Sequence, residues 1–222
     1  MGRISADTIR DCVRAVCAAL PRTGREECAG FIRGLPGPGD SPPKPEIHAG
    51  SHWFCLRSYR DTFTDDRCLQ AFVGTFDSTG DYLGYDRIDP CWLDECGRDD
   101  DGWELTRAYV KPKSRGRGYC SLLVELVLEL AGQNHARWVV AYPRHVGMLV
   151  TLLDYGFGTV GGSLDATLGR IREEGRNNYA RDARQRRLVY AEEFRPFIQD
   201  GSFLMRRRVG RTGLWAALTR DF

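Results

Sequence analysis

A short stretch rich in arginine and glycine, Arg115-Gly-Arg-Gly118, holds the residues of this sequence that are best suited to chemistry. Gly116 and Gly118 allow a tight turn whose backbone N–H groups point outward. An apolar helix that begins just after such a turn adds the positive end of its dipole to those groups. The stretch is therefore suited to bind an anion, and phosphate is the obvious candidate.

The segments on either side of this turn have the patterns of regular elements. Trp103–Val110 alternates in polarity and is rich in β-forming residues, which predicts a strand. Leucine and valine recur at helical spacing over Leu122–Ala131, which predicts a helix. Arg137–Tyr142 is apolar enough for a strand buried on both faces. A strand, a helix and a strand of these lengths predict a parallel, right-handed crossover.

The turn resembles the signature of the GNAT superfamily of acyl-CoA-dependent N-acyltransferases. That signature reads Arg or Gln, two residues, Gly, one residue, then Gly or Ala. Arg115 and Gly118 match its first two fixed positions, and Cys120 stands where the family has Gly or Ala. Val110 and Pro112 match a lead-in that family members often carry. Because cysteine is only slightly larger than alanine, the departure at Cys120 is compatible with backbone binding.

Two further segments resemble the same family. His145 stands where the family has an Asn that heads a helix, here Val146–Tyr155, and Gly156-Phe157 closes that helix with a glycine suited to a left-handed cap. Gln70–Tyr85 is similar to the hairpin formed by the family's second and third strands. The resemblance covers roughly Cys68 to Gly161.

The resemblance implies the fold class α/β, with a GNAT-like mixed central sheet flanked by helices. We expect one domain over residues 1–222, with a core at about 68–162 and a variable N-terminal part at 1–67. Residues 164–200 are expected to form an Arg-rich helical insertion in the C-terminal part. Ser202–Val209 is predicted to be the last strand.

The N-terminal part has weaker patterns. Ser5–Leu20 predicts a helix with Ser5 or Asp7 as its cap. Glu27–Arg33 is interpreted as a short strand, and Gly34–Pro45 contains too many helix and strand breakers for a regular element. His52–Tyr59 fits either a strand or a turn of helix.

The resemblance also implies the co-substrate, acetyl-CoA, and the residues that bind it. In the family, the diphosphate binds the turn and the pantetheine arm adds like an extra strand. The residues that carry over are Ala108, Tyr109 and Val110 for pantetheine, and Arg115, Gly116, Arg117, Gly118, Tyr119 and Cys120 for the diphosphate. His145 is expected either to hydrogen-bond the arm or only to cap its helix.

Acetyl transfer to an amine requires a base, because an alkylammonium with a pKa near ~10 is not a nucleophile at neutral pH. Glu104 lies where histone-acetylating relatives carry their base glutamate, and its neighbours are expected to raise its pKa. A water chain is the alternative. The family's usual acid position holds Leu152, so Tyr155 is our candidate for protonating the leaving thiolate. Tyr142, Cys120 or no dedicated acid remain alternatives.

Composition narrows the class of protein. The chain has 222 residues, 42% of them hydrophobic, which is enough for a core, and a net charge of only +2, which gives no general affinity for nucleic acid. No signal peptide or membrane span is evident, so the cytosol is the expected location. The eight cysteines include no zinc or redox spacing, and we predict no metal site. A cluster of His48, His52, Cys55, Cys91 and Cys96 is the metal-binding alternative.

The leading functional hypothesis is an N-acetyltransferase that acts on a primary amine by direct attack. Between Asp81 and Glu104, nine acidic residues stand against two arginines, a candidate docking surface for a cationic acceptor. A second hypothesis uses the Arg-rich C-terminal part, with Arg206–Arg208, to hold a nucleic-acid acceptor. A third is a non-catalytic acyl-CoA-binding or interaction module. A homodimer is possible in each case.

Overall fold

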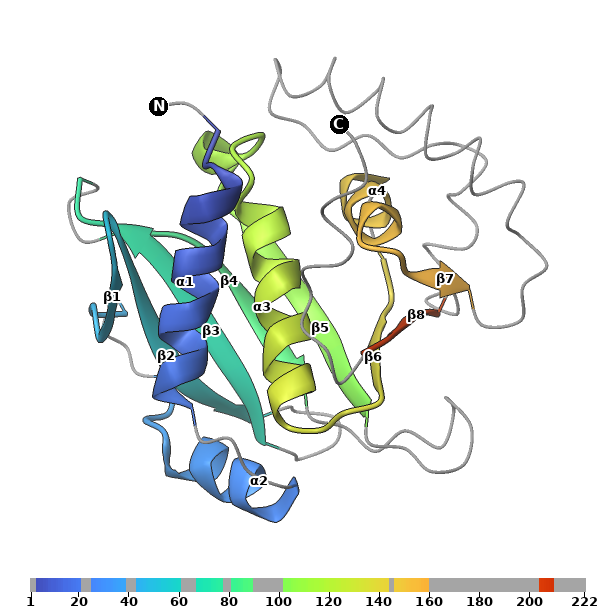
Figure 1. Ribbon diagram of the computed structural model, residues 1–222. Coiled ribbons are helices and arrows are strands. Elements are labelled where there is room, and N and C mark those ends of the chain that lie inside the picture. The colour runs from blue at the N-terminus through green and yellow to red at the C-terminus, as the bar shows by residue number, and fades with distance from the viewer. Residues whose placement is uncertain are drawn as a thin grey trace.

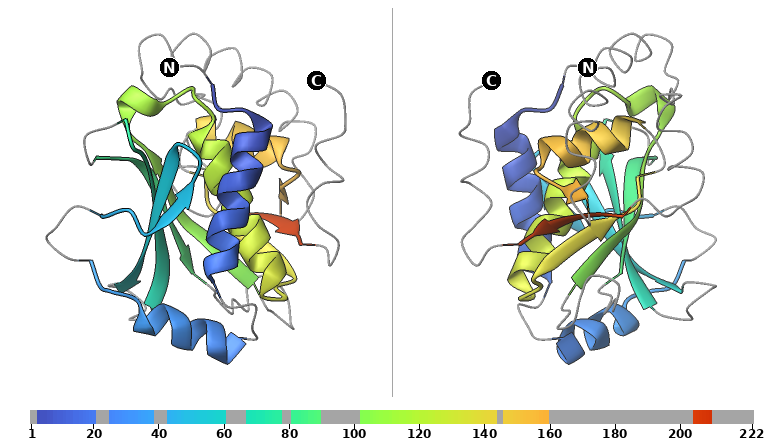
Figure 2. Two further views of the ribbon diagram at one scale, coloured as in Figure 1. Left: turned by 60° about the vertical axis from the view of Figure 1, so that its left-hand side comes forward. Right: turned by 90° about the vertical axis from the view of Figure 1, so that its right-hand side faces the viewer.

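The computed structural model describes residues 3–20, 25–38, 43–60, 67–77, 81–89, 102–143, 146–159 and 204–209. Its centre is an eight-stranded sheet in the order β1-β2-β3-β4-β5-β6-β8-β7. Helices α1 and α3 lie against one face of this sheet, and α4 follows beside the last strands (Figures 1 and 2). The expected α/β class, a mixed sheet flanked by helices, is confirmed. The predicted insertion at 164–200 lies outside the described residues.

Helix α1, Ala6–Ala19, confirms the predicted N-terminal helix. Ser5 is its cap, because the Ser5 hydroxyl accepts a hydrogen bond of 3.1 Å from the Thr8 N–H. Ile9, Val13 and Val16 are buried on one side, and this side packs against α3. An apolar stripe three to four residues apart thus determines how α1 lies on the molecule.

Helix α2, Arg25–Gly34, overturns the interpretation of Glu27–Arg33 as a strand. Cys28 and Ile32 lie four residues apart and are both buried, whereas Glu27 and Arg33 are exposed. This is the spacing of one helical face, with no alternation of period two. The short apolar run Cys28–Ile32 matched both templates, and its burial against the sheet decided for the helix.

The first five strands form an antiparallel meander. They are β1 (Ile47–Ala49), β2 (His52–Arg60), β3 (Arg67–Thr75), β4 (Tyr82–Asp89) and β5 (Gly102–Val110). The antiparallel pair β3–β4 confirms the predicted hairpin, and β2 resolves the choice between strand and helix at His52–Tyr59. Bulges interrupt the register at Val73/Gly74 and at Arg87/Ile88.

The second half of the sheet begins with the predicted crossover. Strand β5 leads through helix α3 (Tyr119–Gln133) to β6 (Trp138–Ala141), which runs parallel to β5. Helix α4 (Val146–Asp154) leads to β7 (Gly158–Thr159), and Gly156 between them is left-handed, with φ 76°, as its position at a helix end predicts. Strand β8 (Met205–Arg208) lies between β6 and β7, within the last strand that the sequence predicts.

Helix α3 is the centre of the core. Its apolar residues lie at nearly every position and are fully buried between α1 and the sheet; they include Leu122, Leu123, Leu126, Val127 and Leu130. Burial of each such side chain contributes about 1.5–3 kcal/mol. The start of α3 is therefore held firmly at the end of β5. Of the helices in the described ranges, none is long and apolar enough to cross a membrane.

Candidate functional site

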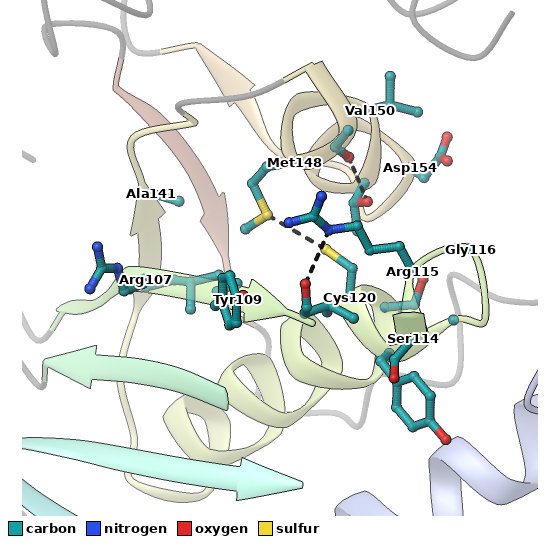
Figure 3. A pocket seen from close by; sticks show the side chains of 18 of the residues that line it. Arg107, Tyr109, Ser114, Arg115, Gly116, Cys120, Ala141, Met148, Val150 and Asp154 are labelled. Carbon is teal, nitrogen blue, oxygen red and sulfur yellow. Dashed lines mark hydrogen bonds between the residues drawn. The ribbon is translucent and has the colours of Figure 1, made fainter. Parts of the chain in front are cut away.

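A cavity of about 570 Å³ opens where β5 and β6 part (Figure 3). Its walls come from the second half of β5, the turn before α3, the first residues of α3, the end of β6 and one side of α4. The lining residues used below are Arg3, Leu105, Arg107, Ala108, Tyr109, Val110, Arg115, Gly116, Gly118, Tyr119, Cys120, Ala141, Tyr142 and Met148.

The cavity exists because β5 and β6 pair over only part of their length. The parallel ladder runs from Gly102 opposite Trp138 to Leu105 opposite Ala141. On the β4 side the bulge gives β5 one extra residue, Thr106, and a bulge increases the local twist of a strand. On the β6 side, Pro143 follows soon after the last paired residue and has no N–H to continue the ladder. Beyond Leu105 the two strands separate.

Alternation along β5 identifies the backbone groups that face the cavity. The Lys111 N–H donates to the Leu83 carbonyl beside β4, at 2.8 Å. The Val110 carbonyl points the other way and accepts from Arg115 Nε at 3.1 Å. Because neighbouring residues of a strand direct their N–H and C=O groups to opposite edges, Ala108 and Val110 face the cavity and Tyr109 faces β4.

The predicted anion-binding turn has the geometry that its glycines allow. Gly116 and Gly118 both have positive φ, 74° and 91°. The first intrahelical bond of α3 runs from the Leu122 N–H to the Gly118 carbonyl at 3.0 Å. The N–H groups of Tyr119, Cys120 and Ser121 precede that bond and have no partner within the helix. The turn and the helix start thus present donors and a positive dipole end to one side of the cavity.

Arg3 is a site residue that sequence reasoning missed. The Ile4 N–H donates to the Arg117 carbonyl at 3.0 Å, so the N-terminal segment crosses the turn. A Cβ on Gly118 would lie 2.9 Å from Ile4 Cγ1, so this close crossing needs glycine. Arg3 is thereby placed in the cavity lining, near the donors of the turn. No local motif marks Arg3, because its position depends on α1 packing against α3.

Cys120 turns its thiol toward α4, where Sγ lies 3.8 Å from Met148 Sδ (Figure 3). Burial raises the pKa of Cys120 to about 11. The side chain is therefore a neutral thiol at pH 7, and it is too weakly ionised to act as a nucleophile. A neutral thiol at the cavity wall can still donate a proton.

Tyr155, the candidate acid, is not among the cavity residues. Its hydroxyl donates to Glu125 Oε1 on α3 at 2.7 Å, and its carbonyl accepts from Arg207 Nη1 at 2.6 Å. Burial, together with the charge of Glu125, raises the pKa of Tyr155. In this geometry Tyr155 ties the end of α4 to α3. The other two candidate donors, Tyr142 and Cys120, do line the cavity.

Glu104, the candidate base, lies just before the point where the strands separate. It stands opposite Val140 on β6 and opposite Asp89 on β4, and its side chain is partly exposed. The next residue, Leu105, lines the closed end of the cavity, whereas Glu104 itself does not. His145, proposed at the head of α4, lies outside the described residues.

Two buried polar groups lie close to the site. His52 Nε2 is 3.2 Å from the hydroxyl of Tyr119, the first residue of α3, and burial lowers the pKa of His52. Asp86 faces the core from β4, opposite Ala108, and is completely buried. Neither carboxyl oxygen of Asp86 has a hydrogen-bond partner in the described parts of the chain, and desolvation raises its pKa well above the ordinary value.

The described part of the chain provides no support for the alternative hypothesis of a metal site. No group of three or more potential ligands comes together among those residues. His52 is engaged with Tyr119, and burial raises the pKa of Cys55 to about 11. Cys91 and Cys96, the other members of the suggested cluster, lie outside the described residues.

Comparison with known proteins finds one family model that matches part of the chain. Residues 41–146 match the model of the acetyltransferase (GNAT) family. This match spans the meander, the turn and α3, and it confirms the resemblance of the sequence to the GNAT superfamily. No curated protein sequence matches the chain.

Several solved structures are similar at low identity. N-acetylglutamate synthase from Neisseria gonorrhoeae, complexed with coenzyme A and N-acetyl-glutamate, is 17% identical over 64% of this chain and 26% of its own, with a TM-score of 0.37. Rv2747 from Mycobacterium tuberculosis, in complex with CoA, is 15% identical over 64% and 76%, with a TM-score of 0.39. A putative phosphinothricin N-acetyltransferase is 14% identical over 72% and 82%, with a TM-score of 0.35.

The chain thus spans about a quarter of the length of the N-acetylglutamate synthase. TM-scores this low transfer no activity, and the likeness to the family depends on the match over residues 41–146.

Proposed function

We propose that this chain, a member of the GNAT superfamily of acetyltransferases, transfers the acetyl group of acetyl-CoA to the nitrogen of an amine. One observation carries the proposal: the open edge of β5 and the donor-rich turn before α3 line the same cavity. A CoA ester has one part that suits each of them. Its diphosphate is an anion, and its pantetheine arm contains amides that can pair with a strand edge.

In this proposal the diphosphate binds the N–H groups of the turn at Arg115–Gly118 and of Tyr119 and Cys120. Arg3 adds positive charge at that end. The arm pairs with the Ala108 backbone, and this pairing directs the thioester toward the closed end, where Leu105 and Ala141 meet. The amine reaches the thioester at that end.

The reaction is direct attack. The amine nitrogen adds to the thioester carbonyl carbon, the C–N bond forms, and the C–S bond breaks to release the CoA thiolate. We assign Glu104 as the base that takes the ammonium proton, acting through water because its side chain lies outside the cavity lining. The thiolate is protonated by solvent or by the neutral Cys120 thiol, since the Tyr155 hydroxyl is bound to Glu125.

A second candidate function is an acyl-CoA-binding module without catalysis. Two observations favour it. Leu152, a buried leucine, stands at the family's acid position, and the hydroxyl of Tyr155 is hydrogen-bonded to Glu125 on α3. The nucleic-acid hypothesis gains less support. Arg207 bonds the Tyr155 carbonyl, and the Arg206 guanidinium lies over Trp138 at 4.5 Å, so neither is simply a surface charge.

The experiment that tests the proposal has two stages. Thermal unfolding is first measured with acetyl-CoA, with CoA and with a dinucleotide that lacks pantetheine. A ligand at a hundred times its Kd adds about 2.7 kcal/mol to the free energy of unfolding, so we expect a clear shift with the two CoA species and none with the dinucleotide. Release of CoA is then followed over a panel of amines.

Each outcome of these two stages has a definite meaning. Acetylated amine, detected by mass spectrometry, supports the enzyme. Binding of acetyl-CoA without transfer to any amine supports the non-catalytic module, and no response to either CoA species contradicts both functions. Glu104→Gln is expected to slow transfer while leaving the thermal shift intact; an unchanged rate at every pH would remove Glu104 from the mechanism.

A further inference from the structure

The sheet face turned away from α1 and α3 carries two adjacent rows of side chains that no step above uses. Register across β2, β3, β4 and β5 aligns Cys55, Phe72, Tyr85 and Tyr109 in one row and Arg57, Gln70, Arg87 and Arg107 in the next. The first is called the aromatic row for its three rings, and the second the arginine row for its three arginines. Their neighbours in the sequence lie on the helix-covered side: Phe54 and Ala71 belong to the core, and Ala108 packs against it. Alternation therefore directs both rows to the opposite face.

The aromatic row is continuous and reaches the cavity. Ring centroids are 5.4 Å apart for Phe72 and Tyr85, and 5.5 Å apart for Tyr85 and Tyr109. Tyr82 widens the row, with its ring 5.2 Å from that of Phe72. All four rings are only partly buried, and Tyr109 also lines the cavity. A planar ring that enters beside Tyr109 thus meets further rings on which to pack.

The arginine row also ends at the cavity, with Arg107 exposed in its lining. The Arg87 guanidinium lies 3.6 Å from the ring centroid of Tyr59 and 5.8 Å from that of Tyr85, so it is held in a fixed plane. Its Nε is buried and has no hydrogen-bond partner among the described residues. Arg57 differs, because it forms an ion pair with Glu46.

These features specify a ligand by charge. A planar guanidinium held beside rings suits a carboxylate, and the exposed Arg107 adds a second positive charge one strand away. Further along β5, the partly exposed Glu104 lies near the closed end where the amine must arrive. The face thus offers, in order, a surface for a ring, a site for an anion and an acidic group for an ammonium.

We propose that this face binds the acceptor and that the acceptor is a primary amine bearing both an aromatic ring and a carboxylate. The inference rests on the proposed function for the chemical step, in which the acceptor nitrogen forms the new C–N bond and CoA leaves as its thiolate. It replaces the expectation of a cationic acceptor with an aromatic amino acid-like one. The ring lies on Tyr85 and Tyr109, and the carboxylate binds Arg87 and Arg107.

The test measures transfer and binding separately. Transfer from acetyl-CoA is compared for phenylalanine, for phenethylamine, which lacks the carboxylate, for alanine, which lacks the ring, and for spermidine, a polycation. Phenylalanine is expected to have a kcat/KM at least tenfold above each of the others. Calorimetry on the CoA-saturated protein then compares N-acetylphenylalanine with N-acetylphenethylamine, and only the first is expected to bind.

Variants locate the two parts of the site. Arg87→Gln and Arg107→Gln should each raise the KM for phenylalanine about tenfold and leave the KM for phenethylamine unchanged. Tyr85→Leu should raise the KM for both of these ring-bearing acceptors. Arg57→Gln is the matched control, because Arg57 lies in the same row but is paired with Glu46. Its discrimination between acceptors should equal that of the unaltered protein.

The outcomes separate this inference from the function on which it rests. Selective binding of N-acetylphenylalanine without acetyl transfer would support the acceptor face and contradict the enzyme. Efficient acetylation of spermidine, with no binding of N-acetylphenylalanine, would contradict the acceptor face and leave the transferase intact. Equal binding of both N-acetyl ligands would overturn the role of the arginine row.

Discussion

The two edges of strand β5 differ although they belong to the same nine residues. Toward β4 the ladder continues through the bulge to Val110. Toward β6 it stops at Leu105, and the remaining residues face the cavity. One edge therefore contributes to the stability of the sheet, and the other directs backbone hydrogen-bonding groups toward the cavity.

A binding site can thus arise within a sheet without a special side chain. A backbone N–H or C=O that has no partner in the protein bonds to water and can exchange that water for a ligand. Tyr109 and Ala108 are neighbours, yet the N–H of Tyr109 faces β4 and that of Ala108 faces the cavity. Changes at these two residues should affect different properties of the protein.

The largest predicted effect follows from proline at these two positions. Tyr109→Pro removes an N–H from the closed edge, and we expect a loss of roughly 3 kcal/mol or more of unfolding free energy. Ala108→Pro removes an N–H from the open edge, so the melting temperature should fall by only a few degrees. Its Kd for acetyl-CoA should rise about tenfold, equivalent to about 1.4 kcal/mol.

Thermal melts and calorimetry check this pair, and Tyr109→Ala controls for loss of the ring. Equal destabilisation by the two prolines, or an unchanged Kd in Ala108→Pro, would show that the edges do not differ as described.

The second prediction concerns Gly118 in the turn after β5, where we expect the diphosphate to bind. Gly118→Ala adds a Cβ at φ 91° and 2.9 Å from Ile4 Cγ1, which costs about 1–3 kcal/mol in backbone strain and displaces Arg3 and Ile4. We expect at least tenfold weaker binding of acetyl-CoA. Gly156→Ala is the control, because Gly156 is also left-handed but has open space around it. It should lower stability and keep the affinity.

The next prediction concerns the pH dependence of stability and Asp86. This residue lies on β4, the strand that pairs with the closed edge of β5, and stands opposite Ala108. Burial raises the pKa of Asp86, so the native state keeps a proton that the unfolded chain releases near pH ~3.9. Stability therefore falls as pH rises from there to the raised native pKa. Asp86→Asn has no carboxyl group to titrate and so does not lose stability in this way. Its free energy of unfolding, relative to that of the unaltered protein, should rise by up to about 1.4 kcal/mol per pH unit in that window.

Urea unfolding at several pH values from 5 to 8 measures this advantage. An advantage for Asp86→Asn that stays constant across the series would mean that Asp86 is charged in the native state.

The smallest effect concerns Arg3, which extends the open site beyond the sheet. Arg3→Ala should weaken the binding of acetyl-CoA about threefold at low salt, and this difference in affinity should shrink as salt screens the charge. Acetyl-pantetheine, which has no diphosphate, should bind both proteins equally. Arg14→Ala, an exposed change on α1, is the control. A salt-independent loss, or a loss for acetyl-pantetheine, would argue against a charge contact.

Local patterns in the sequence predicted the elements that position the site. The Ser5 cap, the two glycines of the turn and the apolar positions of α3 each act over a few residues, and all three were recognised. Cys28–Ile32 was misassigned because a short apolar run fits both helix and strand. The prediction for Tyr155 rested on chain proximity, whereas packing on α3 set the direction of its hydroxyl.

The acceptor face depends on longer-range information. Phe72, Tyr85 and Tyr109 form a row only through the register of three strands, and the bulge at Arg87/Ile88 shifts that register for Glu104. No local pattern encodes such a shift, and Arg3 reaches the cavity only because α1 packs on α3. Sequence reasoning therefore predicted the turn and the strand that line the cavity, and it missed residues such as Arg3 that also line it.

Amide hydrogen exchange at single-residue resolution tests the central claim most directly. The protein is compared alone and saturated with acetyl-CoA, and the amides of Ala108 and Tyr109 are followed by NMR. We predict that exchange at Ala108 slows at least tenfold on binding, whereas Tyr109, already bonded to β4, changes little. An Ala108 amide that exchanges at the same rate in the saturated protein would contradict the account of β5 as the strand that receives the carrier.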